Sequence, residues 1–197
     1  AQPKGRKGKH KGPHEVIMEY PVSPPGSVSL EAFNDACTAC HLCVSACPTH
    51  VIKPALLEYG LAGLMQPRMD YHANYCNFDC IICTEVCPTG ALRPIGMEEK
   101  HTLQLGKVKF IKQNCVVYTD GTDCGACSEH CPTKAVNMKP FRKTLFLPVV
   151  DPNICVGCGA CTNICPTCYC IILNDESENG KFKKVKSYDS CQYNGYA

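Results

Sequence analysis

Hydrophobic residues in this chain fall mostly in short stretches of strand length that are separated by turn-forming residues. Residues 107–111 read Lys-Val-Lys-Phe-Ile, and this alternation predicts a half-exposed strand. Residues 145–150 predict a second strand, in the equivalent place before a later cysteine. Shorter apolar pairs at 51–52, 91–92 and 135–136 are also of strand character.

A hairpin and two helices complete the expected elements. Residues 171–173 and 182–185 are predicted to pair as a hairpin around Asn179-Gly180, a dipeptide typical of tight turns. Residues 54–65 are predicted to form a short helix with proline at its start, and residues 98–105 another.

The apolar and aromatic side chains in and after the first of these helices have two interpretations. They either pack as core between repeats, as such stripes usually do, or line a hydrophobic groove for a quinone or a partner. We expect packing. The residues are Tyr59, Leu61, Leu64, Met65, Met69 and Tyr71.

Cysteine changes this picture, because it accounts for 19 of the 197 residues and recurs in a regular pattern. Sixteen cysteines form four runs of four, and every run ends in Cys-Pro-Thr, which indicates an internal repeat. The runs are Cys37, Cys40, Cys43, Cys47; Cys76, Cys80, Cys83, Cys87; Cys115, Cys124, Cys127, Cys131; and Cys155, Cys158, Cys161, Cys165.

The spacing within the runs indicates iron–sulfur chemistry. Runs one and four match Cys-x2-Cys-x2-Cys-x3-Cys-Pro, which holds [4Fe–4S] clusters by soft thiolate ligands. The proline ends the local helical turn and directs the fourth ligand away from the other three. Disulfides and structural zinc fit less well, because the cysteine count is odd and the cysteines do not form separated pairs. The sixteen cysteines are therefore predicted to ligate four [4Fe–4S] clusters.

Runs two and three depart from the compact spacing. Three residues separate Cys76 from Cys80, and eight separate Cys115 from Cys124. A longer first gap still permits ligation when the loop bulges outward, so we expect ligands here and not free buried thiols. The fourth cysteine of a run reaches a second cluster in two-cluster proteins, so the runs should pair. Either neighbouring runs pair, or the arrangement is nested, with one beside four and two beside three. The outer position of the two compact runs favours nesting.

Three cysteines remain outside the runs: Cys168, Cys170 and Cys191. They are either ligands of a fifth metal site, completed from elsewhere, or free thiols. Three ligands are an incomplete tetrahedral set, which favours free thiols.

Charge is unevenly placed along the chain. The formal net charge is +2, and the first fourteen residues carry +5, so the rest carries 2 − 5 = −3. Residues 1–29 are rich in Lys, Gly, His and Pro and are expected to form a tail or linker without a core. A polybasic segment is typical of the cytoplasmic side of a membrane. The alternative is a solvated tail. We expect a cytoplasmic location near the inner face of the membrane, beside a membrane-anchored partner or an upstream membrane segment.

Other classes of site are excluded or disfavoured. No glycine-rich nucleotide motif occurs, and the basic segment lacks the interleaved aromatic residues typical of nucleic-acid binding. His41 and His130 lie inside runs that already have four cysteines, so neither is expected to be a ligand. No catalytic constellation is evident, so the chain is expected not to be an enzyme by itself.

Residues 20–166 resemble the NapH/NapG-type polyferredoxins of bacterial respiratory chains. The resemblance is carried by the four runs, most specifically by the stretch from Asn114 through Cys115 and Cys124 to Cys127. In membrane-bound members of this group, electrons come from a quinol or a membrane partner. The tail, with Cys165-Pro-Thr-Cys168-Tyr-Cys170 and then Cys191, resembles the iron–sulfur subunits of sulfhydrogenases and anaerobic sulfite reductases.

These observations together predict an α+β, loop-rich fold of tandem bacterial-ferredoxin-like modules, each with two clusters. The expected parts are a tail at 1–29, a four-cluster domain at 30–167 and a C-terminal hairpin tail at 168–197. The expected function is the relay of single electrons between donor and acceptor proteins in an anaerobic or respiratory redox complex. The alternative is a subunit of a reductase or hydrogenase whose tail cysteines form a fifth metal site or part of an active site.

Overall fold

The computed structural model describes residues 16–17, 21–167, 170–173 and 184–185. The chain divides into two units, one formed by residues 1–18 with 181–197 and the other by residues 19–180. In the small unit, β1 (Val16–Ile17) pairs antiparallel with β8 (Lys184–Val185). No helix of the described residues is long and apolar enough to span a bilayer.

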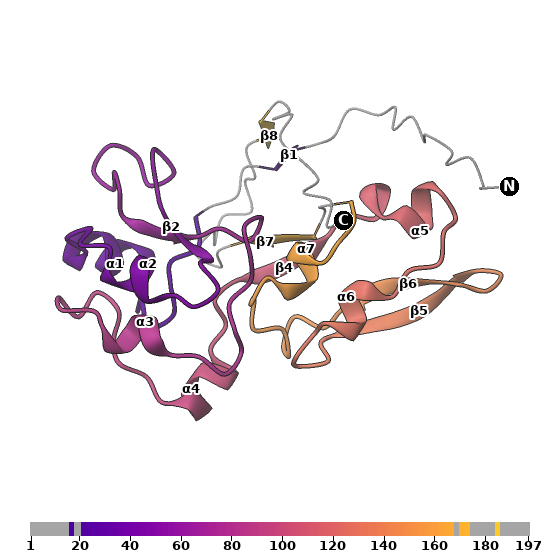
Figure 1. Ribbon diagram of the computed structural model, residues 1–197. Coiled ribbons are helices and arrows are strands. Elements are labelled where there is room, and N and C mark those ends of the chain that lie inside the picture. The colour runs from indigo at the N-terminus through magenta and orange to yellow at the C-terminus, as the bar shows by residue number, and fades with distance from the viewer. Residues whose placement is uncertain (1–15, 18–20, 168–169, 174–183, 186–197) are drawn as a thin grey trace, which may run out of the picture. The chain divides into compact units, whose positions relative to one another are not determined.

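The larger unit has two halves that share a plan of short helices and two-stranded antiparallel sheets joined by loops (Figure 1). This agrees with the expected loop-rich α+β class. The first half contains α1 (Leu30–Ala36), α2 (Leu42–Ala46), β2 (Ile52–Pro54), β3 (Pro67–Met69), α3 (Ile82–Glu85) and α4 (Met97–Thr102). The second half contains β4 (Lys107–Phe110), the 3-10 helix η1 (Lys112–Asn114), α5 (Val116–Thr119), α6 (Ala126–Glu129), β5 (Val136–Arg142), β6 (Leu145–Val150), α7 (Ala160–Asn163) and β7 (Cys170–Leu173).

Three local predictions are confirmed. The alternating stretch at 107–111 forms β4 as far as Phe110, residues 145–150 form β6, and the helix expected at 98–105 forms as α4 but ends at Thr102. Of the apolar pairs, 51–52 and 135–136 lead into β2 and β5, whereas 91–92 is buried without forming a strand.

The hairpin predicted between residues 171–173 and 182–185 is wrong. Strand β7 pairs instead with β4, in the register Phe110↔Cys170 and Lys107↔Leu173. Strand β8 pairs with β1. The reason is that an Asn-Gly dipeptide favours a turn only locally, whereas both strands find partners far away in sequence. The turn itself lies outside the described residues.

The helix predicted at residues 54–65 is also wrong. Residues 55–66 are the loop that joins β2 to β3, closed by an Ala55 N–H bond to the Gln66 carbonyl of 2.8 Å. The Glu58 carboxylate accepts the Leu56 and Leu57 backbone N–H groups at 2.6 and 3.0 Å, and pairs with Arg68 at 2.8 Å. Backbone donors that would start a helix are thus satisfied by a side chain.

The apolar side chains in this loop and just after it only partly follow the expected packing. Met69 and Tyr71 are buried in the core as expected. Leu61 is 82% exposed and Leu64 50% exposed, so the expectation that they pack between repeats is wrong. Without the helix, the loop has no continuous apolar face to bury.

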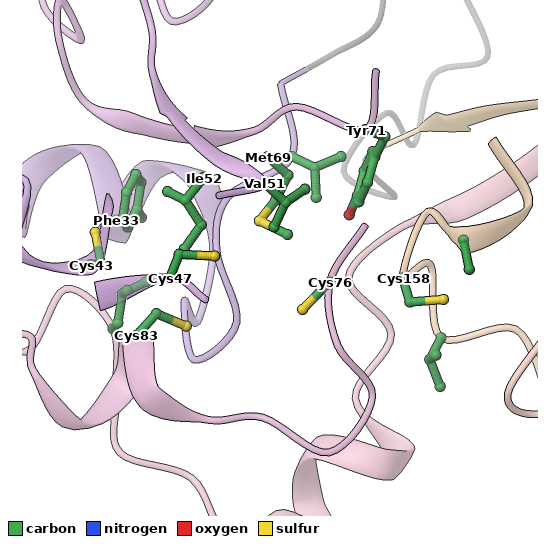
Figure 2. Packing of buried hydrophobic residues seen from close by; sticks show 14 of the residues in the cluster. Phe33, Cys43, Cys47, Val51, Ile52, Met69, Tyr71, Cys76, Cys83 and Cys158 are labelled. Carbon is green, nitrogen blue, oxygen red and sulfur yellow. The ribbon is translucent and has the colours of Figure 1, made fainter. Parts of the chain in front are cut away.

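Cysteine side chains are part of the core of the larger unit. Figure 2 shows Cys43, Cys47 and Cys83 interleaved with Phe33 and Ile52. Phe33 and Ile52 are 1% and 2% exposed, and tryptophan is absent from the chain. Much of the interior is therefore made of ligand-type side chains and few large apolar ones.

The two halves meet through buried backbone and side-chain hydrogen bonds. The Tyr71 hydroxyl donates to the Gly157 carbonyl at 2.8 Å. The Cys76 N–H donates to the Cys158 carbonyl at 2.8 Å, and the Leu105 N–H donates to the Val156 carbonyl at 3.0 Å. These bonds bring run two of the first half beside run four of the second.

Replacing Gly159 with alanine is expected to weaken this junction. Gly159 has a φ of +86°, and an added Cβ would lie 2.0 Å from Cδ1 of the Tyr71 ring. Overpacking of this kind costs about 1–3 kcal/mol. Chemical denaturation should show the loss in Gly159→Ala. Gly96→Ala is the matched control, because Gly96 has open space around it. Equal stability of the two variants would count against the tight junction.

Candidate iron–sulfur sites

The structure gathers the sixteen predicted ligands into four groups, each with three thiols from one run and the fourth from a neighbouring run. We number each site by the run that supplies three thiols. Site 1 is Cys37, Cys40, Cys43 and Cys87; site 2 is Cys76, Cys80, Cys83 and Cys47; site 3 is Cys115, Cys124, Cys127 and Cys165; site 4 is Cys155, Cys158, Cys161 and Cys131.

This grouping corrects the nested arrangement favoured from the sequence. Run one exchanges its fourth cysteine with run two, and run three exchanges its fourth with run four. The cysteine spacing that runs one and four share does not determine which runs lie together, because pairing depends on the loops that connect one run to the next. Neighbouring runs are joined by the shortest loops and cost the least entropy to bring together.

The thiols surround hollows instead of meeting at one point. The empty space at sites 1, 2 and 3, open solvent at the mouth included, is about 310, 300 and 420 Å³. A tetrahedral zinc site would hold its sulfur ligands about 2.3 Å from one centre. In the described part of the chain, no three Cys, His, Asp or Glu side chains converge in the way that a single metal ion needs. A cubane, which binds each thiolate at a different iron corner, fits this donor set.

Each Cys-Pro-Thr sequence forms a turn that places its threonine beside the exchanged ligand. The Cys47 Sγ lies 3.6 Å from the Thr49 hydroxyl. The same contact recurs at 3.7, 3.6 and 3.4 Å in the other three runs. The threonines were not identified as functional from the sequence, although their repetition after every Cys-Pro was the available signal. A hydroxyl that donates to a ligating sulfur stabilises the reduced, more negative form of a cluster.

Backbone donors surround the same sulfurs. The Leu92 N–H donates to the Cys87 Sγ at 3.4 Å. Burial raises the pKa of the Cys87 thiol, but N–H and hydroxyl donors outweigh it, so the net pKa is lowered. The pKa of Cys47 is lowered in the same way by Thr49, Val51 and Ile52. The exchanged ligands of sites 1 and 2 therefore sit in environments that favour thiolate.

The other ligands behave differently. Burial, followed by the charge of neighbouring thiols, raises the pKa of Cys43, Cys127 and Cys158 to about 12; in Cys158, a hydrogen bond to the Ala160 backbone partly opposes the rise. Without metal these thiols are protonated at neutral pH, so ligation must release protons. Four such thiols in one place are stable as anions only when iron compensates their charge.

Helix α4 covers the unusual spacing of run two. The Phe78 ring stacks on His101 with centroids 4.2 Å apart. The His101 Nε2 lies 2.8 Å from Asp79 Oδ1. Both partners come from the three residues between Cys76 and Cys80, so the extra residue of this run is used to dock α4. Lys100 of α4 is buried beside Cys76.

The longer gap of run three contains helix α5, which explains how Cys115 stays within reach of site 3. The Tyr118 and Thr119 N–H groups bond back to the Cys115 carbonyl at 2.8 and 2.9 Å. Beside this helix, the Lys112 ammonium lies 5.0 Å from the Tyr118 ring centroid and 4.7 Å from that of Phe141.

The remaining candidates are two histidines, of which His41 lines the hollow of site 1, and the three cysteines outside the runs. His41 bonds the Met65 carbonyl at 2.8 Å and His130 the Ala126 carbonyl at 3.0 Å. Cys168 and Cys191 are outside the described residues, and Cys170 is described only as part of the backbone of β7. A fifth site among them stays a prediction.

Comparison with protein families supports iron–sulfur chemistry. Three models described as 4Fe-4S dicluster domains match the chain, at residues 36–92, 121–169 and 154–197. The first spans runs one and two, the pair that the structure brings together. The third extends past run four into the tail that carries the additional cysteines.

Curated relatives extend the match across the runs. The ferredoxin-type protein NapG of Escherichia coli K12 is 35% identical over 147 residues, covering 70% of this chain and 62% of NapG. Along its cysteine runs the chain is similar to the ferredoxin-type 4Fe–4S proteins. The resemblance to the NapH/NapG type predicted from the sequence is thus confirmed, and the chain spans about 62% of the length of that relative.

Two further ferredoxin-type proteins match. NapF of Escherichia coli K12 is 28% identical over 137 residues, covering 70% of this chain and 75% of NapF. The methylamine utilization ferredoxin-type protein MauM of Methylobacillus flagellatus is 31% identical over 142 residues, covering 70% of this chain and 60% of MauM. The resemblance of the tail to sulfhydrogenase and sulfite reductase subunits stays a prediction.

Proposed function

We propose that this ferredoxin-type protein relays single electrons through four [4Fe–4S] clusters, held by the sixteen cysteines of sites 1 to 4, within an anaerobic or respiratory redox complex. The observation that carries the proposal is the exchange of the fourth cysteine between neighbouring runs, which yields four complete sets of four thiols. A bound cluster supplies one-electron exchange. The chain holds the ligands, shields them from water and sets their hydrogen bonds.

The contacts between sites support a linear order of 1, 2, 4 and 3. Cys43 of site 1 lies close enough to Cys83 of site 2 to raise its pKa, and Cys161 of site 4 does the same to Cys127 of site 3. The Cys76 N–H bond to the Cys158 carbonyl links sites 2 and 4. Neighbouring sites in this order share contacts between their own ligands, which is what sequential electron transfer requires.

The order places sites 1 and 3 at the ends of the relay. Cys40 of site 1 is exposed, and the ligands of site 3 are all partly exposed. In contrast, three of the four ligands of site 4 are buried, as are three of site 2. We assign donor and acceptor proteins to the two end sites, one to each, because electrons must enter and leave where ligands reach the surface.

Iron and acid-labile sulfide on anaerobically prepared chain test the number of clusters. Four cubanes contain about sixteen of each per chain. About sixteen of each supports the proposal, and about twenty would indicate a fifth cluster at the tail cysteines. A count near eight, or zinc without sulfide, would contradict it.

The location that we propose, the inner face of the membrane, rests on the basic residues at the start of the chain. Each Lys or Arg near an anionic surface contributes about 1 kcal/mol. Replacing all five with glutamine should therefore weaken binding to phosphatidylserine vesicles at least tenfold, measured by co-sedimentation. Unchanged binding would refute this location, and neutral vesicles are the control. The residues are Lys4, Arg6, Lys7, Lys9 and Lys11.

A further inference from the structure

Helix α4 carries a lysine that is almost completely buried. Lys100 is 1% exposed, and its N–H bonds the Gly96 carbonyl at 2.9 Å, within the first turn of the helix. Lysine is among the residues least often found in a protein interior, because a buried ammonium is costly unless it is paired and hydrogen-bonded. Its burial therefore requires an anionic partner nearby.

The partner is Cys76 of site 2, whose sulfur carries negative charge when it ligates iron as a thiolate. The Lys100 side chain hydrogen-bonds the Cys76 thiol, and its charge favours the thiolate. Among the ion pairs of the described residues, carboxylates pair with Arg68, Arg93 and His101, and none pairs with Lys100. The positive charge is thus directed at a cluster ligand.

The neighbours of Lys100 hold it in this position. Glu99 pairs with Arg93, and His101 pairs with Asp79 while stacking on Phe78. These contacts fix the residues on both sides of Lys100 against the first half of the larger unit. The ammonium is therefore positioned by packing, and its burial keeps solvent from screening the charge.

Cys76 is also the ligand at the junction between the two halves. Its N–H donates to the Cys158 carbonyl of site 4, 2.8 Å away. Burial raises the Cys76 pKa overall, with Lys100 opposing that rise. Of the cysteines whose pKa is shifted in the described residues, Cys76 is the one that a cation acts on.

We propose that Lys100 sets the reduction potential of site 2 above the value that its cysteines alone would give, so that an electron rests there before it crosses to site 4. This inference rests on the proposed relay. Reduction adds one negative charge to a cluster, and a fixed cation with an N–H donor to a ligating sulfur stabilises that charge. Lys100 is not itself a ligand, and it affects the reduction potential of site 2 only through Cys76.

The test is an anaerobic redox titration of the full, cluster-loaded chain, followed by EPR. Lys100→Met removes both the positive charge and the hydrogen-bond donor, and the methionine side chain is of similar length. For one cluster of the four, the ratio of reduced to oxidised form at a fixed applied potential is expected to fall at least tenfold. This corresponds to a reduction potential lower by about 59 mV for a one-electron couple. Lys100→Arg should keep most of the original value. Lys112→Met is the control, because Lys112 is exposed and lies near site 3.

A second readout separates the hydrogen bond from general destabilisation. Resonance Raman spectra of Lys100→Met should show a changed iron–thiolate stretch for one cluster, with iron and sulfide still at the wild-type count. If Lys100→Met fails to load, Lys100→Gln replaces it, because glutamine keeps a donor without charge. Glutamine should then give a lower potential than arginine.

The outcomes distinguish this inference from the relay itself. Four unshifted potentials in Lys100→Met, or equal potentials for the glutamine and arginine variants, would overturn the role of Lys100 while leaving four clusters in place. A wild-type chain with fewer clusters would instead contradict the relay.

Discussion

Replacing Cys47 and Cys80 together with alanine is expected to remove one cluster, whereas replacing Cys47 and Cys40 together removes two. Cys47 lies in the sequence of run one, but its sulfur belongs to site 2 with Cys80. Cys40 belongs to site 1. The first pair removes two ligands from site 2 alone, so only that cluster is lost. The second pair removes one ligand from site 1 and one from site 2, so both clusters are lost.

Iron per chain distinguishes the two pairs. The Cys47 and Cys80 variant should keep about twelve iron atoms and the Cys47 and Cys40 variant about eight, since each cubane holds four. The two proteins are matched, because each carries two Cys→Ala changes and both share Cys47→Ala. If each run bound its own cluster with all four cysteines, the two results would be reversed.

Removal of iron is expected to unfold the larger unit. Its core includes Cys43, Cys47, Cys76, Cys83 and Cys158, and it has few large apolar side chains. Without metal, these thiols are polar groups held next to one another in the interior, and burial raises the pKa of each except Cys47, whose net pKa is lowered by hydrogen-bond donors. Metal ligation supplies folding energy in such sites because they do not exist in the unfolded chain.

Circular dichroism of chelated, iron-free chain tests this directly. The expected spectrum is largely that of an unfolded chain, without a cooperative thermal transition. Reconstitution with iron and sulfide under reducing conditions should restore the spectrum of the folded protein and its cooperative thermal transition. Recovery would show that removing iron does not damage the chain irreversibly. An iron-free spectrum that matches that of the loaded protein would refute the dependence of the fold on metal.

The parts of the fold and sites that sequence predicted are those fixed by local geometry. Ligand spacing is local, because three cysteines two residues apart must wrap one centre. The apolar stretch of residues 145–150 is local too, and it corresponds residue for residue to β6. Helix α4, expected from the sequence at 98–105, has an acidic first turn and a basic last turn, as the helix dipole favours.

The parts that sequence missed depend on contacts between distant segments. The pairing of runs, the β4–β7 sheet and the loop at 55–66 are decided by which partner the backbone donors find. Lys100 was not identified from the sequence, because nothing in its own segment reveals that Cys76 lies beside it. The threonines of the Cys-Pro-Thr turns were visible as a repeat, but their contact with sulfur required the turn geometry.

The most direct test of the relay is the number of electrons that one chain accepts. Anaerobic coulometric reduction of the loaded protein should take up four electrons per chain, one for each cluster. EPR of the fully reduced protein should show spin-coupled signals, because neighbouring sites share contacts through Cys43 and Cys83, Cys76 and Cys158, and Cys127 and Cys161. Uptake of two electrons or fewer, or four isolated signals without coupling, would contradict a continuous four-cluster relay.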